Sequence, residues 1–125
     1  MVETKANNGI VKEAPAAIIC LEGEFSDLSF PVYPDEQVII GRDLSTANII
    51  LSNPDVSKKH CIIRYFEPHD AFFVTDVSTS GTYKKNGERL AKNRSIEVAA
   101  GTSISVCDGR NTFLLASKKK NMSGE

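Results

Sequence analysis

Three groups of polar residues place hydroxyl groups, cations and glycines close together in the sequence. They are Gly41-Arg42, Ser57-Lys58-Lys59-His60 and the segment 76–87, which reads DVSTSGTYKKNG. Arginine presents a planar fork of N–H donors and lysine a compact positive charge, while serine and threonine hydroxyl groups can donate to an anionic oxygen. Glycine allows backbone amides to approach a ligand closely. Together, the three groups could surround a tetrahedral dianion such as phosphate or sulfate.

Each group has a simpler explanation when it is taken alone. Gly41-Arg42 could be a turn with a surface charge, and Ser57 or Thr79 could be an ordinary turn residue. Lys58 and Lys59 could belong to a solvated face. The joint occurrence of all three groups on one short, β-rich chain is what favours an anion-binding site.

The elements that must position these groups are short strands. Period-two alternation or compact apolar runs occur in the segments 16–22, 28–34, 37–41, 48–51, 60–66, 71–77, 95–99, 102–108 and 111–117. In the segment 102–108, Ile104 and Val106 should point inward, whereas Ser103, Ser105 and Cys107 should lie on the other face. Turn-forming residues separate the segments, and no window has a helical period. We therefore expect about ten strands in an antiparallel β-sandwich or a barrel, whose loops would carry the function.

The composition argues against several other classes of function. The 125 residues carry a net charge of −1, so the chain lacks the basic surplus of a general nucleic-acid binder. Tyr65, Phe66, Phe72 and Phe73 are predicted to lie in strand interiors, where their rings could not stack on bases. No apolar run is long enough to span a bilayer, and the N-terminus lacks the pattern of a secretory signal. The sequence therefore predicts a cytoplasmic protein that binds neither nucleic acid nor membrane.

The three cysteines, Cys20, Cys61 and Cys107, are predicted to be buried free thiols in a reducing compartment. Their number is odd, and each lies in an apolar, strand-like run. No two of them are close enough in sequence to form a zinc knuckle. We expect neither a metal site nor a cofactor.

A single folded domain is predicted over residues 15–117. Residues 1–14 and 118–125 are polar or charged, and they are predicted to be disordered flanks. The C-terminal flank contains Lys118, Lys119 and Lys120, which we interpret as a solubilising basic tail.

The order and spacing of the polar groups resemble the motif of the forkhead-associated (FHA) domain family. That motif reads Gly-Arg, then Ser-x-x-His, then a loop like Asp-x-Ser-Thr-Asn-Gly-Thr, and finally Asn-Gly. The matching positions here are Gly41-Arg42, Ser57 with His60, the loop 76–82 and Asn86-Gly87. The segment 48–51 resembles the family's Asp-Ile-x-Leu strand, with Asn48 at the aspartate position. The resemblance covers nearly all of the predicted domain.

The resemblance implies a β-sandwich of about eleven strands that binds phosphothreonine in an extended peptide, through loops at one end. It implies that Arg42 contacts the phosphate or the backbone beside it, and that Ser57 binds the phosphate through its hydroxyl group and its amide. Lys58 and Thr79 occupy positions that add further phosphate contacts in the family.

Other matching positions have supporting roles in the family. His60 resembles a histidine that ties the binding loops together by hydrogen bonds and does not touch the ligand. Gly41, Gly81 and the Asn86-Gly87 turn resemble positions that give the loops their shape.

Two positions depart from the family motif. Ser80 stands where the family has an asparagine that holds the backbone of the bound peptide, and serine is shorter, with one donor where asparagine has two. Ser80 is therefore expected to bind the peptide more weakly or in a different arrangement. One extra lysine also precedes the Asn86-Gly87 turn, and we expect it only to lengthen a hairpin.

These features favour a module that recognises phosphothreonine in a partner protein and acts as an adaptor in Ser/Thr kinase signalling. It would act in the cytoplasm or, in a eukaryote, in the nucleus. A degenerate FHA-like domain that binds partners without phosphate is an alternative. An enzyme is a second alternative, because Ser57, His60 and Asp76 include the residue types of a nucleophilic triad. However, the chain has no Gly-x-Ser-x-Gly motif, and Lys58 and Lys59 directly follow the serine.

Overall fold

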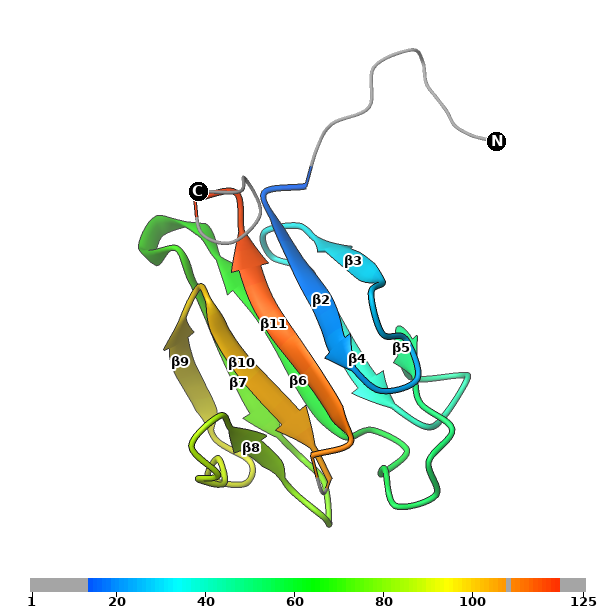
Figure 1. Cartoon of the computed structure of the whole chain (residues 1–125). Coiled ribbons are helices and arrows are strands. Elements are labelled where there is room, and N and C mark those ends of the chain that lie inside the picture. The colour runs from blue at the N-terminus through cyan, green and yellow to red at the C-terminus, as the bar shows by residue number, and fades with distance from the viewer. Residues whose placement is uncertain (1–13, 108, 120–125) are drawn as a thin grey trace, which may run out of the picture.

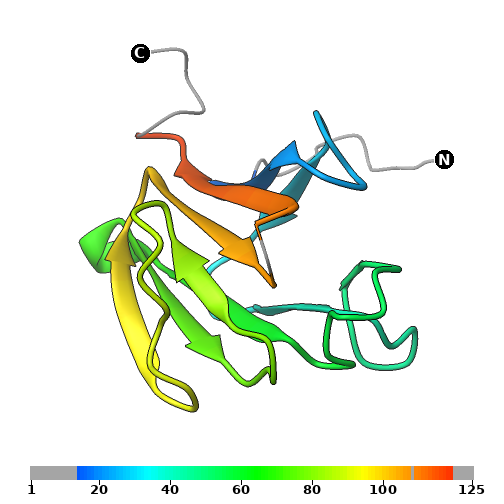
Figure 2. The ribbon, with the colours of Figure 1, turned by 60° about the horizontal axis from the view of Figure 1, so that its bottom comes forward.

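Two β-sheets packed face to face make up the computed structural model, which describes residues 14–107 and 109–119 (Figure 1). Strand labels follow Figure 1. The first sheet contains β2 (Ala16–Glu22), β3 (Ser29–Val32), β8 (Thr82–Lys84), β10 (Thr102–Val106) and β11 (Asn111–Ser117), in the order β3-β2-β11-β10-β8. The second sheet contains β4 (Gln37–Gly41), β5 (Ile49–Ile50), β6 (Cys61–Phe66), β7 (Ala71–Asp76) and β9 (Ser95–Ala99), in the order β5-β4-β6-β7-β9. Figure 2 shows the two sheets as separate layers.

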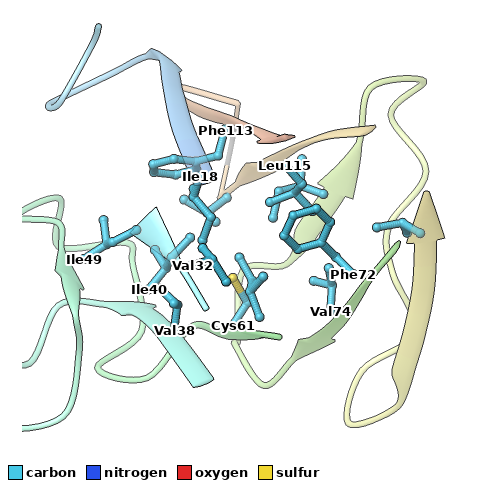
Figure 3. Close-up of a cluster of buried hydrophobic side chains, with 14 of the residues drawn as sticks. Ile18, Val32, Val38, Ile40, Ile49, Cys61, Phe72, Val74, Phe113 and Leu115 are labelled. Atoms are coloured by element: carbon cyan, nitrogen blue, oxygen red, sulfur yellow. The ribbon is translucent and has the colours of Figure 1, made fainter. Parts of the chain in front are cut away.

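The core lies between the sheets, because alternate residues of most strands point inward. In β6, Cys61, Ile63 and Tyr65 are buried, whereas Arg64 between them is exposed. The same alternation in the other strands fills the interior with aliphatic side chains and with the rings of Phe72 and Phe113 (Figure 3). Burial of this apolar surface provides the main stabilisation of the fold.

The sandwich confirms one of the two architectures that the strand pattern favours, and the described residues contain ten strands. The expectation of wholly antiparallel sheets is wrong at one pair, because β4 and β5 are parallel. After β4 the chain makes a loop over residues 42–48. This loop brings it back to the start of a strand, β5, that runs beside β4 in the same direction. Asn48 anchors the return, because its side-chain oxygen accepts a hydrogen bond from the Ile39 amide at 2.8 Å.

Two details of the predicted strand interiors need correction. Tyr65 and Phe72 are buried, but Phe66 and Phe73 are only partly buried, on the outer face of the second sheet. The centroids of the Phe66 and Phe73 rings lie 5.5 Å apart, so the two rings cover each other on that face. Strand β8 was also not predicted, because its three residues lie inside the polar segment 76–87.

The described strands run from Ala16 to Ser117, inside the predicted domain 15–117. The predicted flanks fall almost wholly outside the described residues; only residues 14, 118 and 119 are included. All three cysteines are buried thiols, as predicted, and burial raises the pKa of Cys61 to about 12. Within residues 14–107 and 109–119, no helix is long and apolar enough to cross a membrane.

Four loops gather at one end of the sandwich, at the bottom of Figure 1. They are residues 42–48 after β4, 51–60 between β5 and β6, 77–81 between β7 and β8, and the described residues 107, 109 and 110 between β10 and β11. The three polar groups singled out in the sequence lie mainly in these loops, so the fold brings them to one end of the molecule.

Candidate functional site

A cleft of about 560 Å³ lies between the loops at this end. Its lining residues are Arg42, Pro54, Asp55, Val56, Ser57, Thr79, Ser80, Tyr83 and Cys107. The cleft therefore brings together four of the five residues predicted to bind the ligand. Lys58, the fifth, is exposed next to Ser57 but does not line the cleft.

Arg42 is held against the loop that carries Ser57. Its amide donates to the carbonyl groups of Ser57 at 3.0 Å and Lys58 at 3.1 Å, and its Nε donates to the carbonyl of Val56 at 2.9 Å. Gly41 makes this approach possible, because a Cβ at that position would overlap the Lys58 carbonyl. The two terminal nitrogens of Arg42 make no hydrogen bond with the described part of the chain, so they are available to an anion in the cleft.

His60 connects the second and third polar groups. The Ser57 amide donates to His60 Nδ1 at 3.1 Å, so Nδ1 is the acceptor and Nε2 carries the hydrogen. Nε2 donates to the carbonyl of Gly81 at 2.7 Å. The ring is fully buried, and this burial lowers the pKa of His60, against the opposing effect of the Gly81 bond. His60 is therefore a neutral brace between two loops, in the place that the FHA resemblance implies.

The bond to His60 corrects one expectation about Ser57. Its amide is engaged inside the protein and is not free to bind a phosphate in this conformation. The Ser57 hydroxyl oxygen accepts a hydrogen bond from the Thr79 amide at 3.1 Å, and its own hydrogen remains able to donate. The Thr79 hydroxyl has no partner among the residues described. Two hydroxyl donors therefore line the cleft together with Arg42.

Ser80 lines the cleft, but its hydroxyl group is used within the protein. It donates to the carbonyl of Asp55 at 2.8 Å, and the thiol of Cys107 donates to the same carbonyl at 3.0 Å. The Tyr83 hydroxyl in turn donates to the carbonyl of Ser80 at 2.9 Å. These bonds close one side of the cleft. Ser80 therefore joins two loops, and its contact with a bound peptide stays a prediction.

A buried carboxylate, that of Asp76, organises the loop 77–81. It accepts hydrogen bonds from the Ser78 amide at 3.1 Å, the Ser78 hydroxyl at 2.6 Å and the Thr82 hydroxyl at 3.0 Å. The guanidinium of Arg89 supplies a counter-charge 3.3 Å away. At Gly81 the backbone has φ of +103°, which favours glycine. The loop that presents Thr79 is thus fixed from inside the domain.

Asn86 lies at the tip of a hairpin, outside the cleft. Its side-chain oxygen accepts from the Glu88 amide at 2.9 Å, and the amide of Gly87 donates to the Lys84 carbonyl at 2.9 Å. Asn86 therefore stabilises the turn after β8 and does not line the cleft.

Several residues that shape the cleft were not predicted from the sequence. Glu24, in the connection between β2 and β3, accepts hydrogen bonds from the Ser52 amide at 2.8 Å and the Asn53 amide at 3.2 Å. Tyr83 and Cys107 line the cleft from β8 and from just after β10. Cys107 has φ of +62°, so the regular alternation that predicted its direction ends there. No linear motif connects these residues with Ser57.

The geometry of a nucleophilic triad is missing at Ser57. Both ring nitrogens of His60 bond to backbone groups, and the Ser57 hydroxyl is not hydrogen-bonded to the ring. No group of three or more His, Cys, Asp or Glu side chains in the described ranges could hold a metal ion.

A family model for the FHA domain matches residues 38–107, more than half of the chain. The chain belongs to the FHA domain family. A search of the curated proteins found no match. Among solved structures, the FHA domain of MEK1 is 23% identical, with a TM-score of 0.71, over 83% of this chain and 90% of that one.

Two FHA domains solved with ligands are also similar. The MEK1 FHA domain in complex with a HOP1 phosphothreonine peptide is 25% identical, with a TM-score of 0.67, over 83% of this chain and 97% of that chain. The N-terminal FHA domain of Rad53p from S. cerevisiae, in complex with a phosphothreonine peptide, is 22% identical, with a TM-score of 0.65, over 80% of this chain and 90% of that chain. The cleft of this FHA domain therefore lies on a fold that other proteins use for such complexes.

Proposed function

We propose that this FHA domain binds phosphothreonine in partner proteins. The observation that carries the proposal is the convergence of the Arg42 guanidinium and the hydroxyl groups of Ser57 and Thr79 in one cleft. A phosphothreonine has about −1.5 to −2 charges at neutral pH and three strong acceptor oxygens. These donors match such a group in charge and in hydrogen-bonding capacity.

The expected affinity is that of reversible signalling. A hydrogen bond to a charged group contributes about 1.5–3 kcal/mol. Three or four such bonds, less the costs of desolvation and ordering, correspond to a Kd of about 1 μM. The threonine methyl group would gain further free energy from packing against the wall of the cleft. That methyl is worth about 0.8 kcal/mol when buried, or about a fourfold preference over phosphoserine.

The wider role that fits this chemistry is an adaptor in Ser/Thr kinase signalling, in the cytoplasm or nucleus. FHA domains are generally non-catalytic binding modules. A second candidate function is binding without phosphate, which the inward bond of the Ser80 hydroxyl favours, since that hydroxyl is withheld from a peptide backbone.

Calorimetric titration of one peptide in two forms, phosphorylated and unphosphorylated, tests the proposal after an oriented phosphopeptide library has identified the sequence. The phosphothreonine form should bind wild type with a Kd of about 1 μM, and the unphosphorylated form about a hundredfold more weakly or worse. Arg42→Ala and Ser57→Ala should each weaken phosphopeptide binding by about tenfold or more.

Arg64→Ala is the matched control, because it removes an exposed arginine from the outer face of β6. It should leave the affinity unchanged. Equal affinity for the phosphorylated and unphosphorylated peptides would refute the proposal and favour binding without phosphate.

A further inference from the structure

Two further hollows continue the cleft along the edge of the first sheet. The nearer one, of about 360 Å³, shares Tyr83 and Cys107 with the cleft. The farther one, of about 520 Å³, shares Lys84, Lys85, Ser105 and Gly109 with the nearer one. The shared lining residues place the two hollows side by side. We call the two hollows together the β8–β10 groove, and Lys84, Lys85, Ser105 and Gly109 line both of them.

Tyr83 fixes the junction between the cleft and the groove. It lies opposite Ser105 in the register of β8 and β10. The bond from its hydroxyl to the Ser80 carbonyl ties it to the loop that presents Thr79. A polypeptide that leaves the cleft on this side therefore meets the side chain of Tyr83, and beyond it β8, the edge strand of the first sheet, with β10 next to it (Figure 1).

The groove offers one uncommitted cation. The Nζ atom of Lys84 lies 3.6 Å from Oε1 of Glu88, so Lys84 is already in an ion pair. Lys85 is exposed and makes no ion pair or hydrogen bond with any residue that the structure describes. Lys85 follows the last residue of β8, which pairs with β10 over only three residues. It belongs to the lysine pair that departs from the family motif. The acidic Glu22, at the far end of the groove, is within 3.5 Å of the Thr112 hydroxyl.

We infer that the partner's polypeptide continues from the phosphothreonine over Tyr83 into the β8–β10 groove, and that an acidic side chain in this flank binds Lys85. The groove adjoins the proposed phosphate site, with which it shares Tyr83 and Cys107, and the charge of Lys85 is opposite to that of an Asp or Glu side chain. The substrate class is thus a phosphothreonine with an acidic residue several positions away, on the flank that enters the groove. This inference rests on the proposed function of the cleft.

The test uses the full chain and a 13-residue phosphothreonine peptide with uncharged flanks. A single Glu is scanned through the six positions on each side, and binding is measured at low ionic strength, where surface charges are least screened. At one or two positions on one flank, Glu should strengthen binding to wild type by about threefold, as expected for an exposed ion pair. Lys85→Glu should abolish this gain while binding the phosphopeptide with uncharged flanks within twofold of wild type.

Two controls separate a local contact from a change in overall charge. Arg64→Glu makes the same change in net charge on the other sheet, and it should keep the gain. A peptide with Lys at the responsive position should bind Lys85→Glu more tightly than wild type.

A scan in which no position gains, or a gain that survives in Lys85→Glu, would overturn the inference while leaving the phosphate site intact. If the phosphopeptide with uncharged flanks does not bind wild type at all, both the proposed function and this inference are wrong.

Discussion

At the scale of single residues, the protonation state of His60 determines whether two of the binding loops stay connected. The ring can accept from the Ser57 amide only while Nδ1 is unprotonated, and it donates to the Gly81 carbonyl through Nε2. A protonated ring would place two N–H groups against each other at Ser57. Burial, which lowers the pKa of His60, keeps the ring neutral.

The pH dependence of stability follows from this shift. In the unfolded chain the His60 pKa is about 6.5, and in the folded domain it is lower. The unfolded state then binds more protons, so stability is fully present above pH of about 6.5 and falls as the pH drops below it. Urea unfolding of the ligand-free domain between pH 7.5 and 5 should show this decline. His69→Ala, which changes an exposed histidine, should retain it.

His60→Ala should flatten the decline and lower stability at pH 7.5 by about 2–4 kcal/mol, because two buried backbone groups lose their partner. It should also weaken phosphopeptide binding. An unchanged melting temperature would contradict the bracing role.

At the scale of elements, a loop far from the motif holds the loop that carries Ser57. Glu24 lies between β2 and β3, and its carboxylate accepts from the amides of Ser52 and Asn53 and from the Ser52 hydroxyl at 2.9 Å. The amide of Glu24 itself donates to the Asn111 side chain at 3.1 Å. The first sheet thus fixes a loop that belongs to the second.

Glu24→Gln should therefore weaken phosphopeptide binding by about threefold, because a loosened loop must be ordered again on binding. Hydrogen exchange should show faster exchange of the Ser52 and Asn53 amides. Glu36→Gln is the matched control, since Glu36 is exposed and its side chain has no partner in the described residues. If the two amides lose protection while the affinity stays unchanged, the position of this loop does not matter for binding.

At the scale of the whole molecule, the features that could be predicted from the sequence are those that depend on residues close together in the chain. Strand alternation predicted a sandwich or barrel, and the linear motifs singled out Arg42, Ser57 and Thr79, which the structure brings to one cleft. Contacts between distant segments were not visible, because nothing in the sequence pairs Cys107 with the Asp55 carbonyl or Glu24 with Ser52. Phe66 and Phe73 were misplaced because an apolar residue can also lie on the outer face of a sheet.

The central claim is that loops from one end of the sandwich hold one phosphate dianion between Arg42, Ser57 and Thr79. NMR titration of the isotope-labelled domain, with the phosphorylated and unphosphorylated forms of one peptide, tests it most directly. The phosphorylated form should cause its largest shifts at the Arg42 Nε–H and at the amides of Ser57 and Thr79, and the unphosphorylated form should cause almost none. Equal shifts with both peptides, centred on the outer face of β6 and β7, would contradict the account.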